Sequence, residues 1–170
     1  RRGPDKGVIA AIAVIVMGLL IVAALAGAIL STGGVTIDSY VPSHAEGSNS
    51  YVNASVTKVY TLTLDNYRQS HIEPWGAPGA GKKYVLVAIA HTNTGGDSLS
   101  AHSSLWALHT SDGQVHDYEI VRNSDVPDGL QPGATATYHI MYEVAESAEP
   151  VALEYDAWVT MDRFTIPLAR

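Results

Sequence analysis

The stretch YVLVAIA, residues 84–90, is almost wholly apolar and places β-branched side chains at Val85, Val87 and Ile89. The turn residues NTGG follow it at 93–96. A short apolar run bounded by turn residues is typical of a strand in the centre of a sheet. We therefore predict a central strand here and assign the remaining segments around it.

Apolar and polar residues alternate with a period of two in the flanking segments, which predicts further strands. Tyr60, Leu62 and Leu64 share one face, for example, and Thr61 and Thr63 share the other. Seven or eight short strands with almost no helical pattern predict an all-β, antiparallel β-sandwich over residues 33–170. Besides 84–90, the predicted strands are 35–41, 56–64, 134–144, 151–155 and 161–168, with a hairpin over 105–119 about Asp112-Gly113.

A different pattern opens the chain, where residues 8–30 form an unbroken run of 23 apolar residues. As a helix this run would be roughly 34 Å long, enough to cross a hydrocarbon core of about 30 Å. Small residues four apart, such as Ala23 and Gly27, let neighbouring helices approach closely. We predict a long apolar α-helix over residues 1–32, which serves either as a single-pass anchor or as the packed core of an assembly.

Charge is distributed unevenly along the chain. Arg1, Arg2 and Lys6 precede the apolar run, whereas the part after residue 30 carries seven basic and 16 acidic residues, a formal charge of −9. Basic residues stay on the cytoplasmic side of an inserting helix, so we expect residues 31–170 to face outward. An acidic outer domain argues against nucleic acid as a partner. The absence of cysteine excludes disulfides and thiolate metal sites.

The motifs Arg1-Arg2-Gly3 and Lys6-Gly7, followed at once by the apolar run, resemble the N-termini of archaellins and archaeal type IV pilins. This resemblance implies a precursor held in the membrane, cleavage by a prepilin-type peptidase, and a homopolymer formed through the N-terminal helices. The helix positions that would pack in such a polymer are Val8, Ile12, Ile15, Gly18, Leu19, Val22, Ala23, Ala24, Gly27 and Ala28.

Residues 83–156 resemble a widespread immunoglobulin-like family of bacterial and archaeal surface proteins. The resemblance is carried by YVLV at 84–87, NTG at 93–95, LQPG at 130–133 and LEYD at 153–156. It implies an immunoglobulin-like β-sandwich and supplies no catalytic residues.

Two kinds of candidate site follow from local patterns. Asn53-Ala54-Ser55 is a sequon, so we predict Asn53 as a glycosylation site. His109 and His116 are expected to face one another across the hairpin, about 5 Å apart at Cβ. Two imidazoles would need a third ligand to hold zinc or copper, and their alternation with apolar residues favours the end of an apolar face. No metal site is therefore predicted.

The remaining polar clusters also favour simple roles. Asp112, Asp117, Asp125 and Asp128 match no EF-hand spacing, so we assign them to turns and solubility rather than to calcium. Trp75 lies in a loop rich in proline and glycine and is assigned either to a subunit contact or to loop anchoring. No nucleophile elbow, phosphate-binding loop or zinc-protease motif is present. We predict neither an enzyme nor a cofactor.

Together these patterns lead to one main hypothesis and one alternative. The main hypothesis is a structural subunit of an extracellular cell-surface filament, an archaellum or an archaeal type IV pilus, that serves motility or adhesion. The alternative is a monomeric, membrane-anchored immunoglobulin-like binding module, such as a receptor or a stator component beside a filament motor. The two differ in whether the N-terminal helix polymerises or only tethers.

Overall fold

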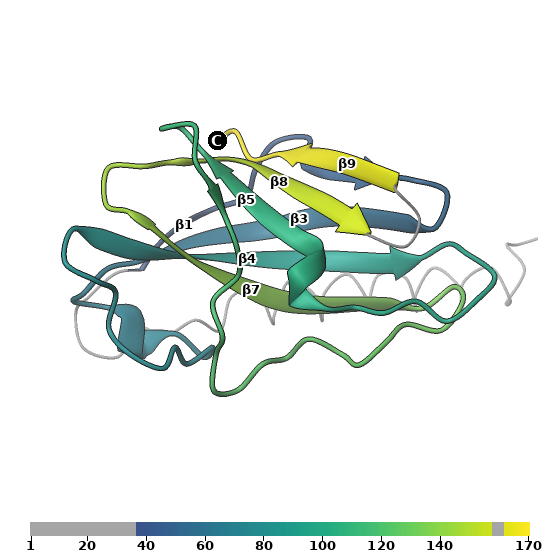
Figure 1. Cartoon of the computed structure of the whole chain (residues 1–170), viewed down its shortest axis with the longest axis horizontal. Helices are drawn as coiled ribbons and strands as arrows, with labels where there is room; N and C mark the ends of the chain where they lie inside the picture. The colour runs from purple at the N-terminus through teal and green to yellow at the C-terminus, as the bar shows by residue number, and fades with distance from the viewer. Residues whose placement is uncertain (1–36, 158–161) are drawn as a thin grey trace, which may run out of the picture. The chain divides into compact units, whose positions relative to one another are not determined.

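The computed structural model describes residues 37–157 and 162–170, and in this part the chain forms two antiparallel β-sheets (Figure 1). One sheet has the order β1-β3-β4-β7, with β2 also paired to β3, and the other has the order β6-β5-β8-β9. The strands of the first sheet are β1 (Asp38–Tyr40), β2 (Glu46–Ser48), β3 (Val52–Leu62), β4 (Lys82–Asn93) and β7 (Thr135–Ala145). Those of the second are β5 (Trp106–Thr110), β6 (Val115–His116), β8 (Pro150–Ala157) and β9 (Asp162–Pro167). Two short 3-10 turns, η1 (Tyr67–Gln69) and η2 (Ser103–Leu105), complete the elements.

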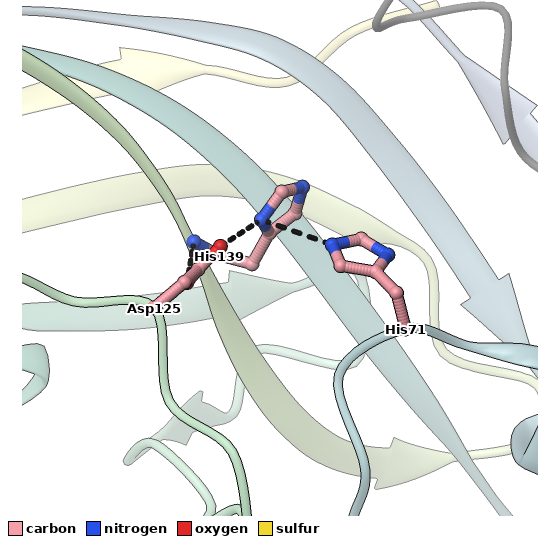
Figure 2. Close-up of side chains that lie close together, drawn as sticks. All are labelled: His71, Asp125 and His139. Carbon is pink, nitrogen blue, oxygen red and sulfur yellow. Dashed lines mark hydrogen bonds and ion pairs between the residues drawn. The ribbon is translucent and has the colours of Figure 1, made fainter.

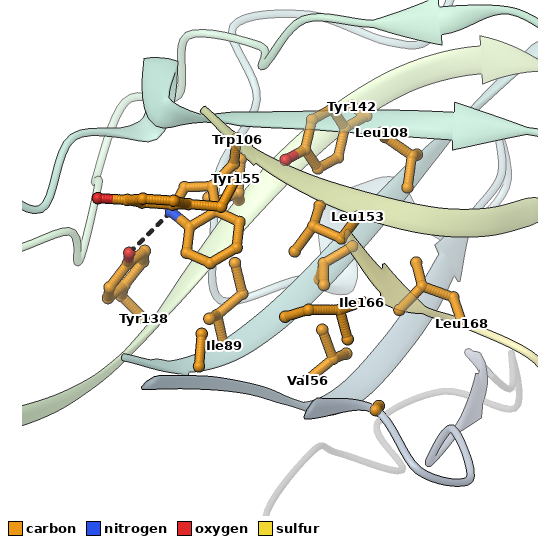
Figure 3. Packing of buried hydrophobic residues seen from close by; sticks show 14 of the residues in the cluster. Val56, Ile89, Trp106, Leu108, Tyr138, Tyr142, Leu153, Tyr155, Ile166 and Leu168 are labelled. Atoms are coloured by element: carbon orange, nitrogen blue, oxygen red, sulfur yellow. Dashed lines mark hydrogen bonds between the residues drawn. The ribbon is translucent and has the colours of Figure 1, made fainter. Parts of the chain in front are cut away.

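The main core lies between the two sheets, and the period-two alternation of the sequence determines which residues enter it (Figure 3). On β7, within the predicted strand 134–144, every second residue points into this core. Trp106 from β5 is buried among them, and its indole Nε1–H donates to the Tyr138 hydroxyl at 3.0 Å. The inward residues of β7 in the core are Tyr138, Ile140, Tyr142 and Val144, with Ala136 packed against them.

The outer face of the first sheet is also covered. Tyr60, Leu86 and Met141 are paired side by side across β3, β4 and β7, and each is at most 5% exposed. Ile72, from the loop between β3 and β4, is 2% exposed. This second buried layer explains why the stretch 84–90 is apolar on both faces of its strand. The predicted grouping of Tyr60 with Leu62 is confirmed, whereas Leu64 lies beyond the strand and is exposed.

The hairpin between β5 and β6 differs from its predicted register by one residue. Leu108 pairs with His116, and His109 pairs with Val115, so the two histidines are not directly opposed. The reason is a longer turn, in which Thr110 N–H donates to the Gln114 carbonyl and Gly113 adopts a positive φ of 77°. Such a turn shifts every following pair by one position.

The predicted fold class requires a correction at its N-terminal part. Between residues 37 and 170, wherever the structure describes the chain, no helix is long and apolar enough to span a membrane, and the only helical turns are η1 and η2. The described fold is therefore an all-β sandwich rather than a long α-helix followed by one. Residues 1–32, including every predicted packing position from Val8 to Ala28, lie outside the described residues.

Candidate metal centre

Three side chains meet on the outer face of the first sheet, where loops cover it (Figure 2). His139 comes from β7, and its position opposite Ala88 of β4 directs it away from the main core. Asp125, from the segment before β7, accepts from the backbone N–H of His139 at 2.8 Å through Oδ1. Its other oxygen, Oδ2, lies 2.7 Å from His139 Nδ1. The carboxylate is thereby fixed against the strand by two contacts.

His71 approaches the same imidazole from the loop between β3 and β4. Its Nε2 lies 3.4 Å from His139 Nδ1, and the two rings meet edge to face with centroids 4.5 Å apart. The ligand atoms of His71, Asp125 and His139 all lie within 4.8 Å of one another. Elsewhere in the described ranges, no other group of three such residues comes this close.

The backbone around His71 is held by the segment that leads to Asp125. Asn123 donates from Nδ2 to the His71 carbonyl at 2.6 Å, and its Oδ1 accepts from the Glu73 N–H at 2.6 Å. Arg122 N–H donates to the Glu73 carbonyl at 2.8 Å. The two loops thus form a small antiparallel contact of their own, which fixes the backbone at His71.

Local electrostatics favour the deprotonated forms of two of these groups. Partial burial lowers the pKa of His71, and the neighbouring His139 lowers it further, against an opposing effect of Asp125. Burial alone would raise the pKa of Asp125, but hydrogen bonds from the side chain and backbone of His139 outweigh it and leave that pKa below its ordinary value. A neutral imidazole and an ionised carboxylate are the forms that coordinate metal ions.

The distance between the two imidazole nitrogens matches that between two ligands of a tetrahedral ion. Ligands at about 2.0–2.1 Å from zinc lie about 3.3 Å from each other in a tetrahedral site, close to the 3.4 Å between His71 Nε2 and His139 Nδ1. The 2.7 Å contact of Asp125 is that of a hydrogen bond, in which His139 Nδ1–H donates to the carboxylate. A bound cation would take the place of this proton and widen the contact by about half an ångström.

The side chains considered in the sequence take other roles. His109 Nε2 lies 2.6 Å from a Glu154 oxygen, and His116 Nε2 lies 3.0 Å from the Thr110 hydroxyl. Asp112 accepts from Thr110 Oγ1 at 2.6 Å, which is the turn role that we predicted for it. Asp117 and Asp128 do not join Asp125 in any such group among the described residues.

Asn53 lies near the start of β3, opposite Ser48 and Thr92, and its side chain is exposed. Its modification remains a prediction. Trp75 is 66% exposed and lies in the loop between β3 and β4. Arg122 lies over its ring, 5.0 Å from the centroid.

Sequence reasoning did not single out His71 or His139, and it considered Asp125 together with Asp112, Asp117 and Asp128 rather than with these histidines. The two histidines are 68 residues apart and share no spacing motif. One feature did point to His139. It is a polar residue on the outward face of its strand, and the next residue on that face, Met141, is apolar and buried.

The fold and this cluster define an antiparallel β-sandwich domain with loops that carry potential ligands across one face. The chain belongs to the family described as "Domain of unknown function (DUF4352)", whose model matches residues 46–163. No curated protein matches the sequence.

Solved structures agree with the sandwich. The Bacillus subtilis ycdA protein, described as a "putative lipoprotein", superposes with a TM-score of 0.55 at 17% identity over 74% of this chain. This chain spans only 39% of ycdA. The Bacillus subtilis yjhA protein has a TM-score of 0.54 at 13% identity, covering 75% of this chain and 99% of yjhA. A conserved hypothetical protein from Bacillus anthracis has a TM-score of 0.51 at 9% identity, covering 80% and 99% of the two chains.

These findings overturn the resemblance to archaellins and archaeal type IV pilins, because the matching family and the structural neighbours are of another kind. The predicted partners are corrected with it, namely the homopolymer through N-terminal helices, the membrane before assembly and the prepilin-type peptidase. Membership in the DUF4352 family likewise replaces the immunoglobulin-like family resemblance. Nothing in the described fold points to pilin partners.

Proposed function

We propose that this chain is a binding module exposed outside the cytoplasm and that it holds a divalent transition-metal ion through His71, Asp125 and His139. The observation that carries the proposal is the convergence of two imidazole nitrogens and one carboxylate within 4.8 Å. Imidazole and carboxylate together suit zinc and its neighbours in the first transition row. The role is capture rather than turnover, because His71 and Asp125 are both exposed, which suits exchange of the ion with solvent.

One observation supports the placement outside the cytoplasm. The structural neighbour ycdA is described as a "putative lipoprotein", and a lipid anchor holds a lipoprotein at a membrane surface. Protection of the chain from added protease in intact cells, with digestion only after lysis, would contradict this placement.

Isothermal titration of the full chain with Zn²⁺ tests the metal site directly. A non-ionic detergent keeps the apolar residues 8–30 from aggregating during the experiment. We expect one equivalent of Zn²⁺ to bind and His139→Ala or His71→Ala to weaken binding by roughly 100-fold or more, since even residues behind the ligands cost 10- to 100-fold. Bound metal should also raise the thermal midpoint of the unaltered chain, because it binds only the folded state.

A matched control is available in His109. This residue also contacts a carboxylate, Glu154, at 2.6 Å, but it lacks the second imidazole. We expect His109→Ala to leave zinc affinity unchanged. If His109→Ala and His139→Ala weaken binding equally, or if neither changes it, Zn²⁺ binds at scattered histidines and the proposed centre is wrong.

A further inference from the structure

A surface hollow lies between the loop that follows β3 and the segment around Arg122. Its volume is about 580 Å³, and it is lined in part by Tyr67, Arg68, Glu73, Trp75 and Arg122. Pockets for small ligands occupy about 300–1,000 Å³. None of the three proposed metal ligands lines it, so the hollow is a distinct feature of the same pair of loops.

Two arginines give this hollow an unusual charge for such an acidic domain. Four other basic side chains of the described ranges form ion pairs with carboxylates: Lys82, Lys83, Arg163 and Arg170. Arg68 and Arg122 have no carboxylate within ion-pair distance among the described residues. With Glu73 as the one acidic group of the lining, the hollow has a formal charge of +1, whereas residues 31–170 carry −9 in total.

Aromatic rings hold both guanidinium groups in place. Arg122 lies over the Trp75 ring at 5.0 Å, and one of its terminal nitrogens donates to the Trp75 carbonyl at 3.4 Å. Arg68 lies over the Tyr67 ring at 5.5 Å and donates from Nε to the Tyr67 hydroxyl at 2.8 Å. Stacked arginines retain further N–H groups that can bind a carboxylate through two hydrogen bonds. Trp75 remains 66% exposed and offers a flat apolar surface.

We propose that this hollow binds a carbohydrate chain that carries carboxylate groups. The carboxylates would pair with Arg68 and Arg122, and the apolar face of a sugar ring would pack on the exposed part of Trp75. A hydrated sugar matches this lining better than an acyl chain does, because charged side chains and Ser70 line the hollow. The proposal does not depend on the metal centre and stands if that centre is wrong.

Titration of the full chain with hexagalacturonate, followed by tryptophan fluorescence and calorimetry, tests the idea. We expect saturable binding that weakens with salt, because the contacts are ionic and exposed. Arg68→Gln and Arg122→Gln should each weaken binding by roughly 10- to 100-fold, the loss that corresponds to one charge-assisted contact. Trp75→Ala should weaken it as well.

Three comparisons make the test decisive. Neutral maltohexaose and free citrate should each bind at least about 10-fold more weakly, because one lacks the charge and the other lacks the ring. Arg163→Gln should leave affinity unchanged, since Arg163 pairs with Asp156 at 2.8 Å outside the hollow. Metal-site variants such as His139→Ala should also retain binding. Equal binding of maltohexaose, an equal loss in Arg163→Gln, or no saturable binding of hexagalacturonate would overturn the proposal.

Discussion

Replacing Tyr138 by phenylalanine should destabilise the fold far more than the same change at Tyr142. Both side chains lie on β7, face the core and are fully buried (Figure 3). The Tyr138 hydroxyl accepts from Trp106 Nε1–H at 3.0 Å and lies 2.7 Å from His91 Nδ1. The Tyr142 hydroxyl has no hydrogen-bond partner among the described residues.

The expected magnitudes follow from these contacts. Loss of the Tyr138 hydroxyl leaves two buried groups without a partner, the Trp106 N–H and the His91 Nδ1, at about 1–3 kcal/mol each. Tyr138→Phe should therefore lower the free energy of unfolding by about 2–6 kcal/mol. Removing the Tyr142 hydroxyl abolishes a buried polar group that already lacks a partner, whose burial costs about 1–3 kcal/mol. Tyr142→Phe should be neutral or stabilising.

Equilibrium unfolding in urea, followed by tryptophan fluorescence and circular dichroism, measures both variants against the unaltered chain. Each substitution deletes one oxygen atom, so the apolar volume of the core is preserved and each variant serves as the control for the other. Equal destabilisation by the two changes would refute the reasoning, since it would show that the Trp106–Tyr138–His91 contacts contribute no more than an unpaired hydroxyl does.

Two further predictions concern acid stability and a close strand contact. Burial lowers the pKa of His91 to about 4, so between that pH and about 6.5 the unfolded chain binds a proton that the folded chain does not. The free energy of unfolding should therefore be highest above about pH 6.5 and fall by about 3 kcal/mol toward pH 4. His91→Gln should reduce that slope in urea unfolding series, and an unchanged slope would contradict this assignment. Gly47→Ala places a Cβ 2.5 Å from the Phe164 ring and should cost about 1–3 kcal/mol, whereas Gly76→Ala meets nothing within 4 Å and should be neutral in the same assay.

The sequence was most informative wherever one face of a strand is buried between the sheets. Ala136, Tyr138 and Ile140 could be assigned to one face, because a strand with alternating apolar residues can place all of them in the core in only one register. The stretch 84–90 also contained a correct signal, since its apolar residues point to both faces and both faces are covered. Periodicity did not indicate that loops, rather than another sheet, cover the outer face.

The candidate centre depends on features that periodicity does not encode. His71 and Asp125 lie in loops, and their approach to His139 is determined by where those loops cross the sheet rather than by any spacing in the chain. The hairpin error has a related cause, because one additional turn residue before Gly113 changed the partner of His109. The Asp112-Gly113 motif therefore predicted where the chain turns, but it predicted neither the length of the turn nor which side chains meet.

The two loops are held together by contacts that do not involve the proposed metal ligands' side chains. Asn123 binds the backbone at His71 and Glu73, and an isolated β-bridge joins Pro74 to Val121. These contacts order the two loops when the chain folds. A bound ion or sugar would therefore not have to supply the free energy of ordering them. The same two loops carry Trp75 and Arg122, which line the hollow. One loop pair thus presents two preorganised and chemically different surfaces, which is the physical basis for expecting binding rather than a purely structural role.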